Sequence, residues 1–216
     1  MNVGKGERQM DESIILVDEN DNEIGYGEKL KVHQEGQLHR AFSIFIFDWS
    51  NYKMLLQKRA GGKYHSGGKW SNACCSHPRR GQSMETALKD RLLDELGMDV
   101  DFRIVEQGAG LLLHGNETIY HCGQFIYYAD FGGLSEHELD HVFLYSPAFG
   151  SINRNAIHAN PEEAEDIRWV TIGELQEWME RSPEDFSAWF KPAFDIAYEV
   201  LCRQARNMDM FERGSQ

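Results

Sequence analysis

The segment from Ala41 to Phe47 constrains the fold most strongly. It reads Ala-Phe-Ser-Ile-Phe-Ile-Phe and is rich in residues that favour extended backbone. Both of its alternating faces are apolar, which predicts a central strand covered on both sides. Ile14–Val17 and Ile24–Tyr26 flank a polar turn and predict a short hairpin before it, and Met54–Lys58 predicts an antiparallel partner after it.

The segment from Ser83 to Leu96 is the clearest helix. Its apolar residues follow helical spacing, Ser83 can cap the first turn, and Gly97 stands where a helix would end. Arg91 and Glu95 are four residues apart on a different face from the apolar stripe, so they are available to a site.

The remaining segments predict a single α/β domain, with strand and helix patterns mixed along the whole chain. Between them, residues 106–121 are rich in glycine and poorly periodic, which favours an insertion or a lid over the pocket. Lys29–His39 predicts a loop or a short helix. The other predicted strands are Phe102–Val105, Thr118–Tyr128, Leu139–Tyr145 and Ile167–Val170, and the other helices are Gly173–Glu180 and Glu184 towards Met208.

Composition narrows the range of partners. The net charge of −13 argues against non-specific binding of nucleic acid, which requires many Lys and Arg side chains. No apolar run approaches the roughly 20 residues needed to span a bilayer, and residues 1–8 lack the apolar core of a signal peptide. A cytoplasmic location is therefore the expectation. The four cysteines show no zinc-ribbon spacing, and the adjacent Cys74 and Cys75 point to opposite faces of an extended chain, so we expect reduced thiols. A small anionic substrate remains compatible, because Lys58, Arg59 and Lys63 form a local basic cluster.

The stretch from Trp70 to Pro78 carries the strongest chemical signal. It reads Trp-Ser-Asn-Ala-Cys-Cys-Ser-His-Pro, with Cys75 two residues before His77. In an extended chain these two side chains lie on the same face, whereas Cys74 lies on the other. The spacing therefore predicts a thiol and an imidazole in one pocket. Together with His33, His39, Glu136 and Glu138, it indicates a metal-assisted active site.

An ordered set of motifs gives the chain a resemblance to the type I isopentenyl-diphosphate Δ-isomerases of the Nudix superfamily. The resemblance covers about Ile14 to the C-terminal helix and is weak over residues 106–124. It implies one Nudix-fold domain over residues 1–216, with a mixed β-sheet between helices. The motifs are Glu28-Lys29 with His33, Leu38-His39-Arg-Ala-Phe42, Leu55-Leu-Gln-Lys-Arg-Ala60, the stretch Trp70 to Pro78, Asp94-Glu95-Leu-Gly97, Glu136-His-Glu138 and Trp189.

The resemblance implies a reversible 1,3-allylic rearrangement of isopentenyl diphosphate to dimethylallyl diphosphate. Such a reaction needs an acid and a base on opposite faces of the alkene in a dry pocket. Cys75 and Glu138 would form this pair. A metal-bound carboxylate is a poor proton donor by itself, so a nearby phenol would relay the proton. The resemblance places Tyr127 there, with Tyr128 as the alternative.

The resemblance also implies two metal sites and a set of substrate contacts. A divalent ion with mixed nitrogen and oxygen ligands would be Mn²⁺ or Zn²⁺, whereas Mg²⁺ suits a carboxylate next to a diphosphate. The first site would comprise His33, His39, His77, Glu136 and Glu138, and the Mg²⁺ site Glu95. The diphosphate would be held by Lys29, Arg59, Lys63 and Ser76, and Trp189 would cover the alkene.

The general Nudix box, G-x5-E-x7-R-E-U-x-E-E-x-G-U with U aliphatic, is degenerate here. Aligned on Gly97, the chain carries Ser76, Gln82, Asp90, Arg91, Asp94 and Glu95 at the defining positions. A hydrolase needs several carboxylates there to assemble metal ions, whereas the isomerase needs one. The alternatives are a Nudix hydrolase acting on a nucleoside or other diphosphate, and a non-catalytic Nudix-fold binding module. The expected oligomeric state is a monomer or a homodimer.

Overall fold

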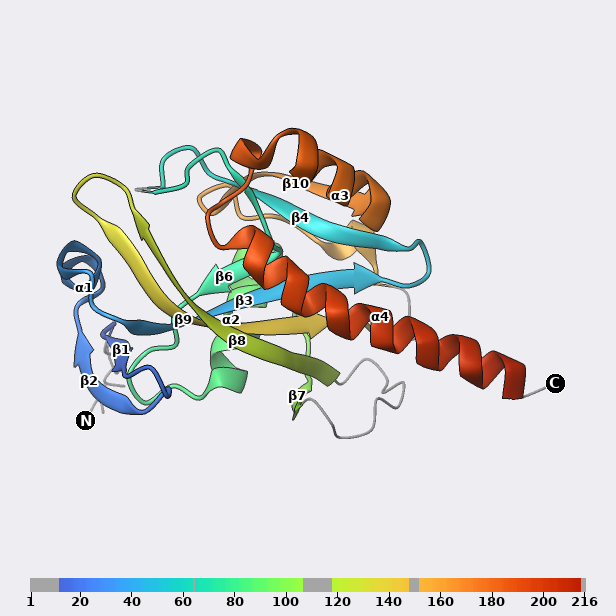
Figure 1. Ribbon diagram of the computed structural model, residues 1–216, viewed down its shortest axis with the longest axis horizontal. Helices are drawn as coiled ribbons and strands as arrows, with labels where there is room; N and C mark the ends of the chain where they lie inside the picture. The colour runs from blue at the N-terminus through green and yellow to red at the C-terminus, as the bar shows by residue number, and fades with distance from the viewer. Residues whose placement is uncertain (1–11, 64, 107–117, 148–151, 215–216) are drawn as a thin grey trace, which may run out of the picture.

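A computed structural model of the chain describes residues 12–63, 65–106, 118–147 and 152–214 (Figure 1). The strands are β1 (Ile14–Val17), β2 (Glu23–Gly27), β3 (His39–Asp48), β4 (Lys53–Arg59), β5 (Trp70–Ser71), β6 (Cys74–Ser76), β7 (Arg103–Glu106), β8 (Thr118–Asp130), β9 (Ser135–Tyr145) and β10 (Ala164–Thr171). The helices are α1 (Lys29–Glu35), α2 (Met84–Leu96), α3 (Ile172–Arg181) and α4 (Phe190–Gly214).

The strands form one mixed sheet with the order β10-β4-β3-β9-β8-β7. The pairs β3–β9 and β7–β8 are parallel, and the other neighbours along this path are antiparallel. The short strands β1 and β6 pair with β3, and β5 pairs with β4. The predicted central strand is therefore confirmed, because β3 contacts four other strands.

The two faces of β3 explain the layered architecture. Phe42, Ile44 and Ile46 point into one cluster of buried residues, which includes Leu88 and Leu92 of α2. Phe45 and Phe47 point into the other, which includes Phe190 and Phe194 of α4. Figure 1 shows α4 crossing in front of the strands, with α2 behind them. The expected arrangement of a mixed sheet between helices is confirmed.

Helix α2 begins and ends where the sequence predicts. The Ser83 side chain accepts a hydrogen bond from the Thr86 amide at 3.2 Å, and Gly97 has the positive φ of 66° that favours glycine. Because α2 ends at Leu96, Glu95 lies in its last turn. There its side chain is buried rather than solvated.

The C-terminal helix begins six residues later than predicted, at Phe190 rather than Glu184. Residues Pro183–Asp185 form a short 3-10 turn, and Phe186 then pairs with Trp70 in an isolated bridge. The Ser187 amide donates to the Trp70 carbonyl at 2.9 Å, so this segment is extended along β5. Trp189 consequently lies just before α4, at the edge of the site.

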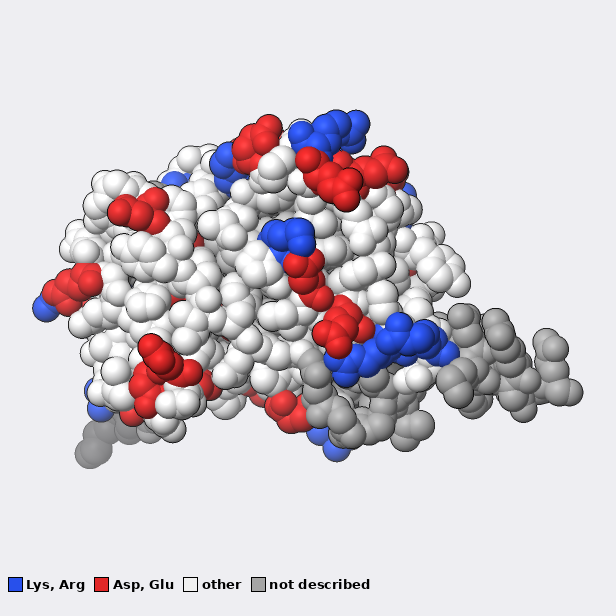
Figure 2. Space-filling view, in the orientation of Figure 1, with Lys and Arg blue, Asp and Glu red and all other residues white. Residues whose placement is uncertain are grey.

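The predicted insertion or lid falls mostly outside the described residues. Glu106 ends β7 and residues 118–121 begin β8, whereas residues 107–117 are not described. Within the part of the chain that is described, no helix has the length and apolar character required to cross a membrane. Along the exposed side of α4, Lys191 pairs with Asp195 and Arg203 with Glu199, and Figure 2 shows both charges side by side there.

Candidate active site

Sheet register brings the central acidic and imidazole groups into one row. His39 of β3 is the direct partner of Glu138 of β9, and Glu138 is the direct partner of Tyr127 of β8. Side chains of direct partners on neighbouring strands lie on the same face of the sheet. Three residues from distant parts of the chain are therefore adjacent by sheet geometry alone.

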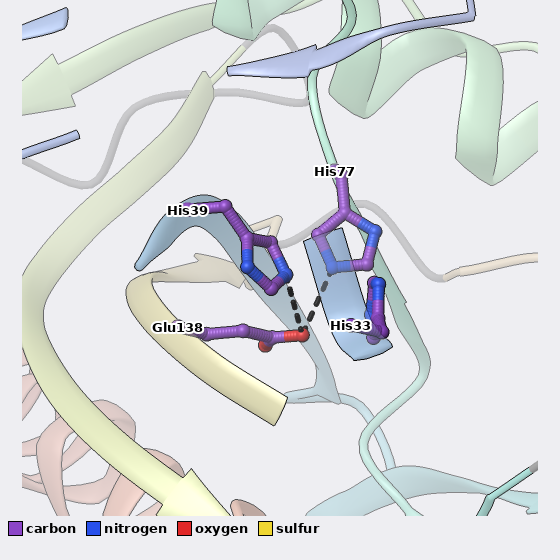
Figure 3. Close-up of side chains that lie close together, drawn as sticks. All are labelled: His33, His39, His77 and Glu138. Atoms are coloured by element: carbon purple, nitrogen blue, oxygen red, sulfur yellow. Dashed lines mark hydrogen bonds and ion pairs between the residues drawn. The ribbon is translucent and has the colours of Figure 1, made fainter. Parts of the chain in front are cut away.

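Two further histidines complete a buried cluster around this row. His33 comes from α1 and His77 follows β6, which pairs with β3. One ligand atom from each of His33, His39, His77 and Glu138 lies within 4.8 Å of the others (Figure 3). Three imidazoles and a carboxylate thus converge from α1, β3, β9 and the loop after β6. They form a donor set that suits a divalent transition metal.

Hydrogen bonds to backbone carbonyls fix the tautomers of two histidines so that each can bind a metal ion through Nε2. His33 Nδ1 lies 2.7 Å from the Lys29 carbonyl, and His39 Nδ1 lies 2.8 Å from the Gln37 carbonyl. A carbonyl can only accept, so each Nδ1 carries the hydrogen and each Nε2 presents a lone pair. Among the described residues the Nε2 of buried His39 makes no hydrogen bond, and it lies 3.6 Å from Glu138 Oε1. These residues fit a bound metal.

The protonation states of the cluster agree with this role. Burial lowers the pKa of His33 to about 4, despite the Lys29 carbonyl, so its imidazole is neutral near pH 7. His77 Nε2 lies 2.9 Å from Glu138 Oε1. Although burial opposes ionisation of Glu138, His77 and His39 hold the pKa of this carboxyl well below its usual range.

Glu136 lies on the same face of β9 but outside the four-residue cluster. Its Oε1 is 2.9 Å from His65 Nε2, and its Oε2 is 3.1 Å from the Tyr127 hydroxyl. Burial and then the nearby Glu138 carboxylate raise the pKa of Glu136 to about 9. Two buried carboxylates that do not both ionise without a cation form the charge pattern that a divalent ion neutralises.

The geometry distinguishes the two candidate phenols. The Tyr127 hydroxyl donates to Glu138 Oε2 at 2.7 Å, and burial raises the pKa of this phenol well above its ordinary value. Tyr128 is 61% exposed, and its ring packs against His137 instead. Tyr127 is therefore the phenol that reaches the cluster.

The two adjacent cysteines have different surroundings, as the alternation along a strand requires. Cys75 opens into the site, where its Sγ lies 3.3 Å from Arg59 Nη1. Burial raises the pKa of Cys75 to about 12, although Arg59 opposes the shift, so Cys75 is a protonated thiol at neutral pH. Cys74 is fully buried in the core beneath α2.

A single cavity of about 170 Å³ collects most of the predicted site residues. His33 and His39 are not among the residues that line it but lie beside His77 and Glu138 in the cluster. The cavity is also lined by Ser43, Arg79, Arg91 and Glu163. The predicted residues that line it are Lys29, Arg59, Lys63, Cys75, Ser76, His77, Glu95, Tyr127, Glu136, Glu138 and Trp189.

One end of this cavity is a mixed charge cluster around Glu95. Arg91 Nη2 donates to Glu95 Oε1 at 2.6 Å, and Gln57 donates to Oε2 at 3.1 Å. Burial raises the pKa of Glu95, although Arg91 opposes the shift. Lys63 and Arg91 both contact Glu163, at 2.5 Å and 3.3 Å. Cations and a buried carboxylate thus occur together, as a site for a metal-bound diphosphate requires.

The position of Trp189 is fixed by a hydrogen bond from its indole nitrogen. Its Nε1 donates to Asn72 Oδ1 at 3.0 Å, and the Arg59 guanidinium lies 5.1 Å from its ring centroid. The ring is 6.3 Å from that of Tyr127. Asn72, within the Trp70–Pro78 stretch, therefore orients the aromatic side chain that covers the site.

His65 is the site residue that sequence reasoning missed. It lies in the connection between β4 and β5, is 6% exposed, and reaches Glu136 across the cavity. A lone histidine in a glycine-rich loop carries no periodicity or motif that would single it out. Gln57 was missed for a related reason, because its partner Glu95 is distant in the sequence.

The fold and the site together define a Nudix-type domain, and comparison with known proteins agrees. The NUDIX domain family matches residues 37–190. The protein DR0079 from Deinococcus radiodurans has a similar structure, with a TM-score of 0.56 over 86% of this chain and 97% of that chain, at 15% identity. That level of identity supports the fold alone.

Sequence relatives give a finer result. The chain is 42% identical over 195 residues to isopentenyl-diphosphate Delta-isomerase 2 of Aromatoleum aromaticum, covering 90% of this chain and 89% of that protein. It is 43% identical over 199 residues to the isopentenyl-diphosphate Delta-isomerase of Serratia proteamaculans, covering 91% and 98%. This chain belongs to the isopentenyl-diphosphate Δ-isomerase family.

Proposed function

We propose that this chain interconverts isopentenyl diphosphate and dimethylallyl diphosphate, the isomerisation that supplies isoprenoid biosynthesis. One observation carries the proposal beyond family membership. A protonated thiol, an ionised carboxylate with its phenol, and a set of cations line the same small cavity. The reaction requires these three kinds of group: an acid and a base that act on the alkene, and cations that bind the diphosphate.

The reaction adds a proton to the terminal methylene carbon and removes one from the carbon on the other side of the double bond. Positive charge develops on the tertiary carbon between them. Cys75 would serve one face of the alkene, and Glu138 with Tyr127 the other. Cys75 holds its proton at neutral pH, whereas Glu138 is ionised and already accepts the Tyr127 hydrogen. Each turnover would exchange the protonation states of the two sides.

Water exclusion matters because a tertiary carbocation reacts readily with water. Trp189 would lie over the alkene, where its ring face attracts developing positive charge. Its hydrogen bond to Asn72 fixes the ring, and the side chain is 2% exposed. The cavity is small enough for a five-carbon chain to displace its water.

His33, His39, His77, Glu136 and Glu138 would hold one divalent metal. The balance of nitrogen and oxygen donors favours Mn²⁺ or Zn²⁺. When bound, the ion would keep Glu138 ionised and lower its proton affinity, so that the shared proton would stay on the Tyr127 hydroxyl. The histidines and their backbone carbonyl partners supply the rigid frame that orients Glu138 towards the substrate.

The diphosphate would occupy the charged end of the cavity. Lys29, Arg59 and Lys63 would bind its oxygens, and Ser76 would add a hydrogen bond. Glu95 would hold a Mg²⁺ ion, which would neutralise negative charge on the diphosphate. Gln82 donates to Asp90 at 2.8 Å, so two of the degenerate box positions contact each other.

The deciding experiment incubates the protein with isopentenyl diphosphate, Mg²⁺ and Mn²⁺ in D₂O and follows the products by NMR. Deuterated dimethylallyl diphosphate without release of phosphate is the expected result. Release of phosphate or diphosphate would support the Nudix hydrolase instead. Binding of substrate without any product would support a non-catalytic module.

A further inference from the structure

The His65–Glu136 contact lies beside the proposed metal ligands but belongs to no motif of the sequence. His65 Nε2 is 2.9 Å from Glu136 Oε1, and both side chains are 4% exposed. A loop residue is thus fully enclosed in the site. Its ring packs at 5.2 Å against Phe131 and at 6.1 Å against Trp189, which fixes its orientation.

The side-chain contacts that orient Glu136 come from outside its own strand, from His65 and from Tyr127 of β8. Its Oε2 shares the Tyr127 hydroxyl with Glu138, and that hydroxyl has a single hydrogen to donate. The shorter contact, 2.7 Å, goes to Glu138, so Glu136 has the weaker hold on Tyr127. The Oε1 contact with His65 therefore decides where the Glu136 carboxylate points.

The position of His65 directs this carboxylate towards the histidine cluster. The rings of His65 and His33 are stacked, 6.2 Å apart at 20°. Glu136 is two residues from Glu138 on the same face of β9, so both carboxylates lie next to the cluster. A carboxylate that is hydrogen-bonded on one oxygen can present the other to a metal with little loss of rotamer freedom.

We propose that His65 is a positioning residue for the metal site, whose Nε2–H fixes Glu136 as the fifth ligand beside His33, His39, His77 and Glu138. The inference rests on the proposed function through the metal site alone and does not require turnover. It assigns a role to a residue outside every motif.

The test is a titration of the metal-free protein with Co²⁺, whose visible absorption reports both affinity and coordination. Two variants are matched. His65→Gln retains an N–H donor at similar reach, whereas His65→Leu removes the donor and keeps apolar bulk. We expect His65→Leu to weaken Co²⁺ binding about 10- to 100-fold and to change the absorption intensity. We expect His65→Gln to stay within about threefold of the wild type.

Several outcomes would overturn the inference. One is that wild type and His65→Leu have the same Co²⁺ affinity and the same spectrum. Another is that His65→Leu and His65→Gln weaken Co²⁺ binding equally, because loss of the N–H donor would then not be the cause. If His65→Leu does not fold, as judged by circular dichroism, His65→Phe replaces it because it keeps a ring against Phe131.

A third variant separates this inference from the metal site itself. Glu138→Gln removes a ligand of the central cluster and should weaken Co²⁺ binding more than His65→Leu does. If Glu138→Gln leaves Co²⁺ affinity unchanged, the proposed metal site fails and the role of His65 fails with it. If Glu138→Gln weakens Co²⁺ binding but the His65 variants bind Co²⁺ as the wild type does, the metal site is supported and only the inference about His65 is wrong.

Discussion

Replacing Arg91 by Leu should lower the free energy of unfolding, because the buried Glu95 carboxylate loses its charged partner. Glu95 is 2% exposed, and Arg91 donates two hydrogen bonds to its Oε1, at 2.6 and 3.0 Å. Breaking one side of a buried ion pair generally costs about 3–5 kcal/mol, because the remaining charge is uncompensated. Glu163 would keep Lys63 at 2.5 Å, so the effect of Arg91→Leu centres on Glu95.

Protonation sets an upper limit on this cost. The ordinary pKa of Glu95 is 4.5. Instead of carrying an unpaired charge, the folded variant can take up a proton, and at pH 7 this costs about 1.4 kcal/mol for each of about 2.5 pH units, or roughly 3.5 kcal/mol. At pH 5 the same limit is about 0.7 kcal/mol. The loss of stability in Arg91→Leu should therefore be about 3 kcal/mol at pH 7 and below about 1 kcal/mol at pH 5.

The sign follows from proton counting. In the variant, the folded state keeps Glu95 protonated above pH 4.5, whereas the unfolded state releases that proton. The folded state thus binds more protons, and the free energy of unfolding falls as the pH rises. Because burial also raises the pKa of Glu95 in the wild type, the deficit should grow with pH and reach a slope of about 1.4 kcal/mol per pH unit only where the wild-type carboxyl is ionised.

Urea unfolding at pH 5, 6 and 7, with EDTA present, measures this difference. The control is Glu95→Gln combined with Arg91→Leu, which has no carboxyl to ionise and should show a deficit that is independent of pH. A deficit in Arg91→Leu that is the same at all three pH values would refute the reasoning. It would mean that the lost interactions are packing contacts rather than charge compensation.

Three shorter predictions concern the substrate side of the cavity. Cys75→Ala should abolish turnover in the D₂O assay while Cys74→Ala largely spares it; full activity in both would remove Cys75 from the mechanism. Because the pKa of Cys75 is raised to about 12, iodoacetamide should alkylate it at pH 8 on the order of a thousandfold more slowly than a free cysteine, as peptide mass spectrometry can follow, and a rate that levels off below pH 10 would contradict the shift. Trp189→Phe should lower the free energy of unfolding by about 1–2 kcal/mol, since the buried Asn72 Oδ1 loses its indole donor and keeps only the Ser71 hydroxyl; urea unfolding measures this, and an unchanged free energy would contradict it.

Local patterns in the sequence were sufficient for most elements of the fold. The two-faced apolar pattern of Ala41–Phe47 correctly predicted a central strand, and Ser83 and Gly97 correctly bounded α2. The C-terminal helix was predicted to begin at Glu184, which placed residues 186–189 inside it. Their pairing with Trp70 is a tertiary contact, which local propensity does not encode.

The candidate site was predictable only where motifs carry it. Cys75, His77 and Glu95 lie in stretches whose spacing is characteristic, and the structure brings them to one cavity. His65 lies in a loop, and its partner Glu136 lies 71 positions further along the chain. Nothing in either segment indicates the other, because their contact depends on how β4 and β9 are placed on the two sides of β3.

The register of β9 against β3 determines both which side chains of β9 enter the core and which of them reach the site. Strand β9 places Val142 and Leu144 in the cluster beneath α4, and Phe143 and Tyr145 in the cluster beneath α2. A slip of one residue against β3 would exchange these sets and force the larger rings into the space of Val142. The same slip would remove Glu138 from His39. The apolar half of β9 therefore fixes the position of its acidic half, so the row His39–Glu138–Tyr127 is maintained by hydrophobic packing several residues away from the reaction.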